Sequence, residues 1–312
     1  MLATLSQLPL SAGDWVFEHK YDGERVEAVR NGSKVDLVSR SGRSLTGTYP
    51  ELVQALLRQP TERFVIDGEV VALDDHGVPS FERLQGRFGL SDPSPAQRAV
   101  AVVYYVFDLL QLDDRDVTSL PLRDRKQLLR KALHFRKPLR FSDHESGDPQ
   151  QLLAAACAER YEGVMAKRAD RPYAVGKRTN DWLKLKCKQG QEMVIGGWTD
   201  PRRTRVGLGA LLLGYYADGE FVYAGKVGTG FGTAVLRSLE EQLRTLERST
   251  SPFDRGDPPH RGTHWAEPKL VCEVEFSEWT RSGQLRQPRF KGLRDDKDPK
   301  AVVREDPRPS AA

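Results

Sequence analysis

The stretch EHKYDGER, residues 18–25, contains a lysine and a turn dipeptide, and the turn is the starting point for predicting the fold. It follows the apolar residues 15–17, and Asp22-Gly23 is a dipeptide that favours a turn between strands. Asn31-Gly32, further on, is a second such dipeptide. The pattern predicts short strands at 15–20, 25–30 and 34–38. Taken alone, the stretch also fits a charged hairpin on a solvated edge, because short patterns recur by chance.

The segments that follow alternate between strand and helix patterns. Two runs are rich in β-branched and aromatic residues, which is typical of buried strands. Three others space their apolar residues every three or four positions, as amphipathic helices do. The expected strands are 63–73 and 101–112, and the expected helices are 49–59, 122–134 and 149–161. This mixture predicts an antiparallel α+β domain over residues 1–190.

The pattern changes after about residue 190. Several short strands with a single helix in roughly 110 residues fit a small β-barrel of the OB type. The expected strands are 193–198, 210–216, 220–227 and 272–276, and the expected helix is 233–247. We therefore predict an OB-fold domain at 191–300, followed by a flexible tail at 301–312.

Composition limits the class of protein but does not select a function. The chain has 312 residues, enough for about two domains, with 38% hydrophobic and 29% charged residues. The net charge of +4 permits a polyanionic partner without requiring one. We found neither an apolar run of membrane-spanning length nor a signal-peptide pattern, so we expect a cytoplasmic protein that is not exported.

The three cysteines are far apart in the sequence and show no metal-ligand spacing. Cys157, Cys187 and Cys272 include no CxxC pair, and their number is odd. We therefore expect three incidental thiols in a reducing compartment, with neither a disulfide framework nor a zinc site.

Further short motifs follow the first stretch in a fixed order. They are Ser39-Arg40, Asp67-Gly68-Glu69, FDLL at 107–110, EGVMAK at 162–167, WLKLK at 182–186 and RDDK at 294–297. Each alone is a weak signal, but the ordered series resembles the nucleotidyltransferase motifs of the ATP-dependent DNA ligases. The resemblance spans roughly residues 1–300 and is greatest to the ligase domains of bacterial end-joining ligases of the LigD type. Ligases of larger organisms carry a further DNA-binding domain ahead of this core, whereas here nineteen residues precede Lys20.

Lys20 is the nucleophile that this resemblance implies. A lysine that attacks the α-phosphorus of ATP must first lose its proton. A free lysine has a pKa near ~10.4, so about one in 2,500 is neutral at pH 7, a handicap of roughly 4.6 kcal/mol. Nearby cations disfavour one more positive charge, and we expect bound magnesium, Arg25, Lys184 and Lys186 to supply them.

The resemblance also implies roles for the residues that match the other motifs. Glu18 would accept a hydrogen bond from the adenine amino group, beside His19, while Phe107 and Met165 would cover the two faces of the base. Glu69 would bind the ribose or a metal, and Glu162 would hold Mg²⁺ or Mn²⁺. Phosphate contacts and transition-state stabilisation would come from Asp22, Arg25, Arg40, Arg178, Lys184, Lys186, Arg294 and Lys297. Without the series, most of these would be ordinary core or surface residues.

The function implied is sealing of 5′-phosphate/3′-hydroxyl nicks in duplex DNA, in double-strand break repair by end joining. Basic runs at 177–188 and 281–294 fit sequence-independent contacts to phosphates, although charge runs are often only solvated faces. Ku and polymerase or nuclease domains are candidate partners, and we expect a monomer. The alternatives are RNA end joining or mRNA capping with GTP, an NAD-dependent ligase, and a non-catalytic nucleic-acid-binding module.

Overall fold

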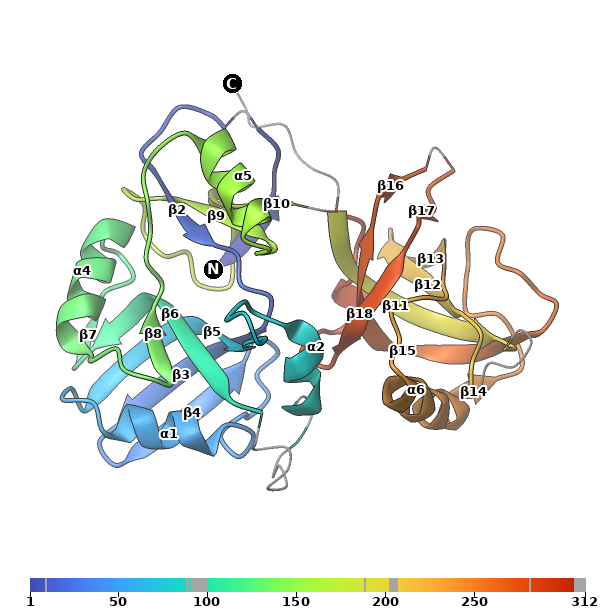
Figure 1. Ribbon diagram of the computed structural model, residues 1–312, viewed down its shortest axis with the longest axis horizontal. Helices are drawn as coiled ribbons and strands as arrows, with labels where there is room; N and C mark the ends of the chain where they lie inside the picture. The colour runs from blue at the N-terminus through green and yellow to red at the C-terminus, as the bar shows by residue number, and fades with distance from the viewer. Residues whose placement is uncertain are drawn as a thin grey trace. The chain divides into compact units, whose positions relative to one another are not determined.

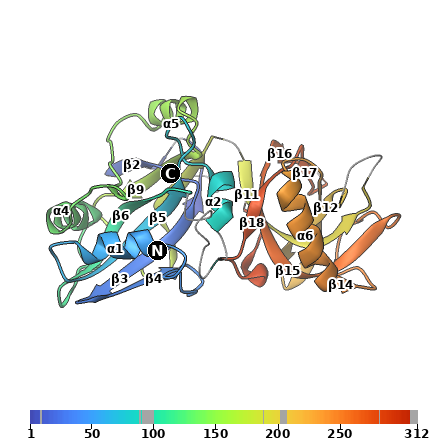
Figure 2. The same cartoon turned by 60° about the horizontal axis from the view of Figure 1, so that its bottom comes forward.

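A computed structural model describes residues 1–8, 10–87, 90, 100–187, 189–201, 207–280 and 282–305. The chain forms two compact units, Met1–Cys187 and Lys188–Glu305, which are described separately below. Figures 1 and 2 show the elements of each unit from two directions. Among the described residues, every helix is too short or too polar to cross a lipid bilayer.

The larger sheet of the first unit has the strand order β4-β3-β5-β6-β7, with β8 beside β6. All its pairs are antiparallel except β6 with β8. Buried residues from α1 and α4 pack with those on one face of this sheet, and both helices flank it in Figure 1. The strands are β3 (Glu24–Asn31), β4 (Lys34–Ser39), β5 (Arg63–Ala72), β6 (Val102–Leu112), β7 (Arg115–Asp116) and β8 (Leu139–Phe141).

The smaller sheet of this unit has the order β1-β10-β9-β2 and is covered on one face by α5. Its strands are β1 (Leu2–Leu5), β2 (Trp15–His19), β9 (Gly163–Arg168) and β10 (Arg178–Lys186). The helices of the unit are α1 (Pro50–Leu57), α2 (Phe81–Leu84), η1 (Gln85–Arg87), α4 (Leu122–Ala132) and α5 (Pro149–Ala158). The strand and helix segments predicted in this unit are all present, whereas β1, β7, β8, β9, α2 and η1 match no predicted segment.

The turn dipeptides at the start of the chain have two different outcomes. Asn31-Gly32 does join a hairpin, since β3 pairs with β4 next to it. Asp22-Gly23 does not, because β2 lies in the smaller sheet and β3 in the larger one. The chain therefore crosses between the sheets at this point. A Cβ at Gly23 would lie 2.2 Å from the carbonyl oxygen of Val70, so the crossing requires glycine for close approach.

The second unit is a six-stranded sheet with order β13-β12-β11-β15-β14, in which β18 also pairs with β15. One helix packs with its buried core, and the separate pair β16-β17 lies beside it. The strands are β11 (Gln189–Thr199), β12 (Leu211–Ala217), β13 (Glu220–Val227), β14 (Glu247–Arg248), β15 (Thr263–Phe276), β16 (Glu278–Trp279), β17 (Leu285–Arg286) and β18 (Arg289–Arg294). The helices are α6 (Thr233–Thr245) and η2 (Pro299–Ala301). Of the predicted tail at 301–312, residues 301–305 are described and pack on the second unit. Val302 is buried, its carbonyl accepts from Tyr216 N at 2.8 Å, and Glu305 N donates to Gln191 at 3.0 Å. Residues 306–312 lie outside the described residues.

The expectation of three free thiols was wrong. Cys157 and Cys187 form a disulfide, while Cys272 is free and buried. The two half-cystines lie at the end of α5 and immediately after β10, with their Cα atoms 5.5 Å apart. The packing of α5 on the sheet that contains β10 brings them together, and no short sequence spacing could indicate it.

Candidate active site

The smaller sheet carries its polar functional residues on one face. Phe17, Leu183 and Leu185 are buried with α5, so the alternating residues of β2 and β10 point to the other side. Strand register places Glu18, Met165 and Lys184 in one row across β2, β9 and β10. The next row holds Lys20, Gly163 and Lys186, since Lys20 N donates to Gly163 O at 2.9 Å.

Lys20, Glu162 and Lys186 form an ion-pair cluster at the end of this face. The Lys20 ammonium contacts one oxygen of Glu162, and Lys186 Nζ lies 3.1 Å from the other. Burial would raise the pKa of Glu162, but the two ammonium groups lower it to about 2. Of the cations expected around Lys20, Lys186 shares the Glu162 carboxylate with it, and the group in direct contact with Lys20 is that carboxylate.

Glu18 lies in a second, fully buried cluster. Its carboxylate accepts hydrogen bonds from Lys126 Nζ at 2.9 Å and Ser142 Oγ at 2.6 Å, and Lys167 Nζ is 3.1 Å away. Burial opposes the charge, yet the two lysines and the hydroxyl hold the pKa of Glu18 below its ordinary value. Glu18 is thus ionised and fixed in direction, as a selective hydrogen-bond acceptor should be.

Phe107, on β6, brings the larger sheet up to this face. Its ring centroid lies 4.2 Å from Lys167 Nζ, and its ring meets that of Trp182 edge to face at 5.8 Å. Met165 lies in the row between Glu18 and Lys184. The two residues expected to cover the faces of the base therefore lie on the two sheets of one unit, beside the buried Glu18 cluster.

Arg25 has a different environment from the one expected for a phosphate contact. Its guanidinium forms two hydrogen bonds to Asp67, at 3.0 and 2.6 Å, and a third to Tyr173 Oη at 3.1 Å. Tyr173 also donates to Asp67 at 2.7 Å. In register, Arg25 lies opposite Glu69. A phosphate role for Arg25 remains a prediction, and it requires the guanidinium to exchange Asp67 for phosphate.

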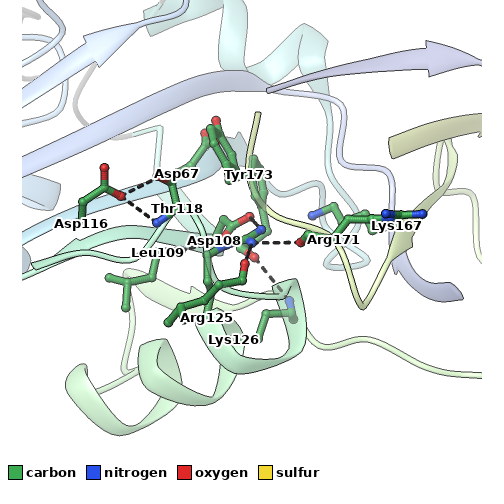
Figure 3. Close-up of polar contacts among 12 residues, drawn as sticks. Asp67, Asp108, Leu109, Asp116, Thr118, Arg125, Lys126, Lys167, Arg171 and Tyr173 are labelled. Atoms are coloured by element: carbon green, nitrogen blue, oxygen red, sulfur yellow. Dashed lines mark hydrogen bonds and ion pairs between the residues drawn. The ribbon is translucent and has the colours of Figure 1, made fainter. Parts of the chain in front are cut away.

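A buried ion pair next to Phe107 and Lys126 supports the site (Figure 3). Arg125 donates to both oxygens of Asp108, at 2.7 and 2.8 Å, and both side chains are fully buried. Arg125 also donates to the Arg171 carbonyl at 3.2 Å. Asp108 follows Phe107, and Lys126 follows Arg125. This pair therefore fixes the two segments that carry the neighbouring site residues Phe107 and Lys126.

Four expected residues lie outside these two rows of the smaller sheet. Arg178 is the first residue of β10, six residues before Lys184 and so about 20 Å away along a strand, and it donates to the Ala3 carbonyl. Arg40 is exposed after β4. Asp22 lies at the crossing between the sheets. His19 stacks on Tyr161 with centroids 3.8 Å apart and shares the side of β2 that carries Phe17.

Arg294 and Lys297 belong to the second unit, where both are held by acidic side chains. Arg294 is bidentate to Asp296, with both nitrogen–oxygen distances at 2.9 Å. Burial would lower the pKa of Arg294, but Asp296 keeps it well above its ordinary value. Lys297 Nζ lies 2.7 Å from Glu192. Their expected action on ATP remains a prediction.

Glu162 and Glu69 could bind a divalent cation that is also coordinated by the phosphates of a nucleotide. Among the described residues there is no cluster of three or more metal-ligating side chains. Mg²⁺ commonly uses one or two carboxylates together with substrate phosphates, and it prefers charged oxygen ligands. Glu162, with its pKa near 2, supplies such an oxygen at neutral pH. Glu69, on the adjoining sheet, is the second candidate.

Comparison with known proteins decides the family. A model described as the ATP dependent DNA ligase domain matches residues 3–186, and one described as the ATP dependent DNA ligase C terminal region matches residues 204–297. This chain belongs to the ATP-dependent DNA ligase family. Its α+β core is thus a nucleotidyltransferase domain followed by an OB-fold domain, as predicted.

Similar proteins narrow the relationship within the ligases. The chain is 40% identical to the "Multifunctional non-homologous end joining protein LigD" of Pseudomonas aeruginosa, over 98% of this chain and 36% of that protein. Identity is also 40% to its Mycobacterium bovis counterpart, over 98% of this chain and 39% of that protein. The ligase chain therefore spans little more than a third of these curated relatives.

A solved structure agrees with the assignment. The structure described as mycobacterial DNA ligase D complexed with ATP and MES matches with a TM-score of 0.68 and 38% identity. The match covers 97% of this chain and 98% of that one. The two chains therefore match over nearly their whole lengths.

Sequence reasoning missed the residues that hold Glu18 and Arg25 in place. Lys126 and Ser142 come from α4 and the segment after β8, and Tyr173 comes from the loop between β9 and β10. None matches a motif used above. Lys167 could have been found, because it ends the EGVMAK motif and alternates with Met165 along one strand face.

Proposed function

We propose that this chain seals 5′-phosphate/3′-hydroxyl nicks in duplex DNA through a covalent AMP on Lys20. The observation that carries the proposal is the placement of the Lys20 amine at the end of β2, against Glu162 and one residue row from Met165. That placement fits a nucleophile beside a base pocket, and it lies within the segment that matches the ligase domain model.

Three phosphoryl-transfer steps follow from this chemistry. In the first, Lys20 Nζ loses a proton and bonds to the α-phosphorus of ATP, while the bond to pyrophosphate breaks. In the second, an oxygen of the DNA 5′-phosphate bonds to the AMP phosphorus and the phosphorus–nitrogen bond breaks. In the third, the 3′-hydroxyl oxygen bonds to the 5′-phosphorus, loses its proton, and AMP leaves.

The residues around Lys20 have separable tasks in this scheme. Glu162 orients the amine, and Lys184 and Lys186 stabilise negative charge on the transferring phosphate. Glu18 selects adenine by accepting its amino hydrogen, between Phe107 and Met165. Magnesium or manganese, held by Glu162 and Glu69 together with the phosphates, would supply further charge neutralisation.

The biological setting is part of the same proposal. The basic runs 177–188 and 281–294 would contact DNA phosphates without reading sequence. The relatives are named for end joining, so we propose double-strand break repair in the bacterial cytoplasm as the setting, with Ku and polymerase or nuclease domains as partners. We propose that the chain acts as a monomer.

A nick-sealing assay tests the function. The chain is incubated with a nicked, 5′-labelled duplex and either ATP or GTP. We expect ligated product with ATP but not with GTP. When the nick carries a pre-formed 5′-AMP, we expect sealing without any added nucleotide. Binding of DNA without any sealing on either substrate would favour the non-catalytic module, and a covalent adduct formed from GTP alone would favour capping.

A further inference from the structure

A cavity of about 290 Å³ lies at the β2 edge of the smaller sheet, beneath α5. Phe17 and Val164, from the side of the sheet that packs on α5, contribute to its lining. Glu18 borders both this cavity and the site described above, whereas Lys20, Phe107 and Met165 do not line the cavity. Binding pockets for small molecules commonly run from roughly 300 to 1,000 Å³. The cavity is therefore at the small end of that range, suited to one side chain or a small ion rather than a nucleotide.

Aromatic rings form much of its wall. His19 and Tyr161 are stacked with centroids 3.8 Å apart, and Tyr21 and Tyr105 are stacked at 4.1 Å. Tyr21 meets Tyr161 edge to face at 6.3 Å, which joins the two stacks into one cluster. Ring faces of this kind attract cations and stack on planar groups.

Carboxylates supply the charge that complements a cation. Asp143, Glu145 and Glu159 line the same cavity. Asp143 pairs with Arg130, but within the described ranges neither Glu145 nor Glu159 has an ion pair. Two backbone hydrogen bonds of 2.9 Å between Glu145 and Phe17 hold that residue against the sheet edge.

His19 adds a hydrogen-bonding atom without a partner. Its Nδ1 is buried, and in the part of the chain that the structure describes it makes no hydrogen bond. Burial lowers the pKa of His19, against the opposing effect of Glu159 and Glu145. A neutral imidazole can accept a hydrogen bond through one ring nitrogen. Because Nδ1 is closed to solvent, the rest of the ring and not this atom faces the cavity.

We propose that this cavity binds a guanidinium group, either of a free small molecule or of an arginine side chain on a polypeptide. A guanidinium is planar, stacks on aromatic faces, and donates several hydrogen bonds in a fixed fork to carboxylates. A quaternary ammonium would match the rings and the charge but has no N–H to donate.

Titration of the whole chain with defined probes tests the site without any nucleotide. The probes are the blocked tripeptide Gly-Arg-Gly, free arginine and tetramethylammonium, and the readout is the NMR signals of the His19 and Tyr161 rings. We expect saturable shifts with a guanidinium probe and weaker binding of tetramethylammonium. Binding of the tripeptide alone would assign a polypeptide source, and binding of both arginine probes would assign the group irrespective of source.

Matched variants complete the test. Glu159→Gln and Tyr161→Leu should each weaken binding roughly tenfold. Glu62→Gln removes an exposed carboxylate of the same unit outside the cavity and should leave binding unchanged. Unchanged thermal unfolding of Glu159→Gln separates lost binding from lost folding. Absence of ring shifts at millimolar probe, or equal affinity of Glu159→Gln and the wild type, would overturn the proposal.

Discussion

Asp108 and Arg125 show how single residues hold the site in place. Each side chain is fully buried, and each satisfies the other's charge through two hydrogen bonds. Removing one member of such a pair leaves an uncompensated charge in the interior, which costs far more than the pair itself contributes. The same reasoning applies to Glu18 with its two lysines.

Arg125→Met should therefore lower the free energy of unfolding by about 3–5 kcal/mol, measured by urea denaturation. Replacing both partners, as in Asp108→Leu with Arg125→Met, should restore much of that loss, because no buried charge then remains unpaired. A loss below about 1 kcal/mol for the single variant would contradict the role given to this pair.

The lowered pKa of Glu162 predicts that the free energy of unfolding depends on pH in the acid range. Its pKa is about 2 in the folded chain, below the ordinary value of 4.5. A lowered pKa means that its stabilising effect is complete above about pH 4.5 and is lost as pH falls towards 2. The difference in unfolding free energy between wild type and Glu162→Gln should be constant above pH 5 and shrink below pH 4.5. A difference that changes between pH 6 and 8 instead would be inconsistent with this pKa.

At the scale of elements, the periodicity of the sequence indicated which segments form strands, but it did not indicate which strands pair with each other. The alternation of Leu183 and Leu185 with Lys184 and Lys186 is the pattern of a strand with one apolar and one basic face, and both leucines of β10 are buried. The Asp22-Gly23 dipeptide suggested a hairpin, but the chain crosses to the other sheet there. Local sequence specifies a turn, whereas the partner of each strand depends on contacts between distant residues.

The disulfide gives the element-scale prediction. Cys157 and Cys187 close a loop with a sequence separation of 30 around β9 and β10. In the chain-entropy model a loop of this size contributes about 3–4 kcal/mol. Treatment with a dithiol should lower the thermal midpoint of the wild type, whereas the midpoint of Cys157→Ser with Cys187→Ser should not respond. Free-thiol counting before reduction provides the check: one thiol is expected, and three would contradict the bond.

At the scale of the whole molecule, the ordered motifs indicated the family but not the environment of each residue. Seven motifs along one chain carry more information than any local pattern, and the family assignment holds. Lys126, Ser142 and Tyr173 could not be predicted, because they act through burial and packing that join distant segments. The motifs identified Arg25 as a candidate site residue, but they did not indicate that it pairs with Asp67.

Arg294, in the second unit, tests whether both units serve the same reaction. If it aligns the pyrophosphate leaving group, Arg294→Ala should slow self-adenylation on the order of a hundredfold. Sealing of pre-adenylated nicks should be affected much less. Arg244→Ala, an exposed arginine on α6, is the matched control and should leave both steps unchanged. Equal loss in both steps for Arg294→Ala would argue against the leaving-group role.

The most direct test of the account is the intact mass of the chain after incubation with ATP and magnesium. Wild type and Lys34→Ala, which removes an exposed lysine of the same unit, should both gain the mass of one AMP. Lys20→Ala should gain none. An AMP adduct on Lys20→Ala at the wild-type yield would contradict the assignment of Lys20 as the nucleophile.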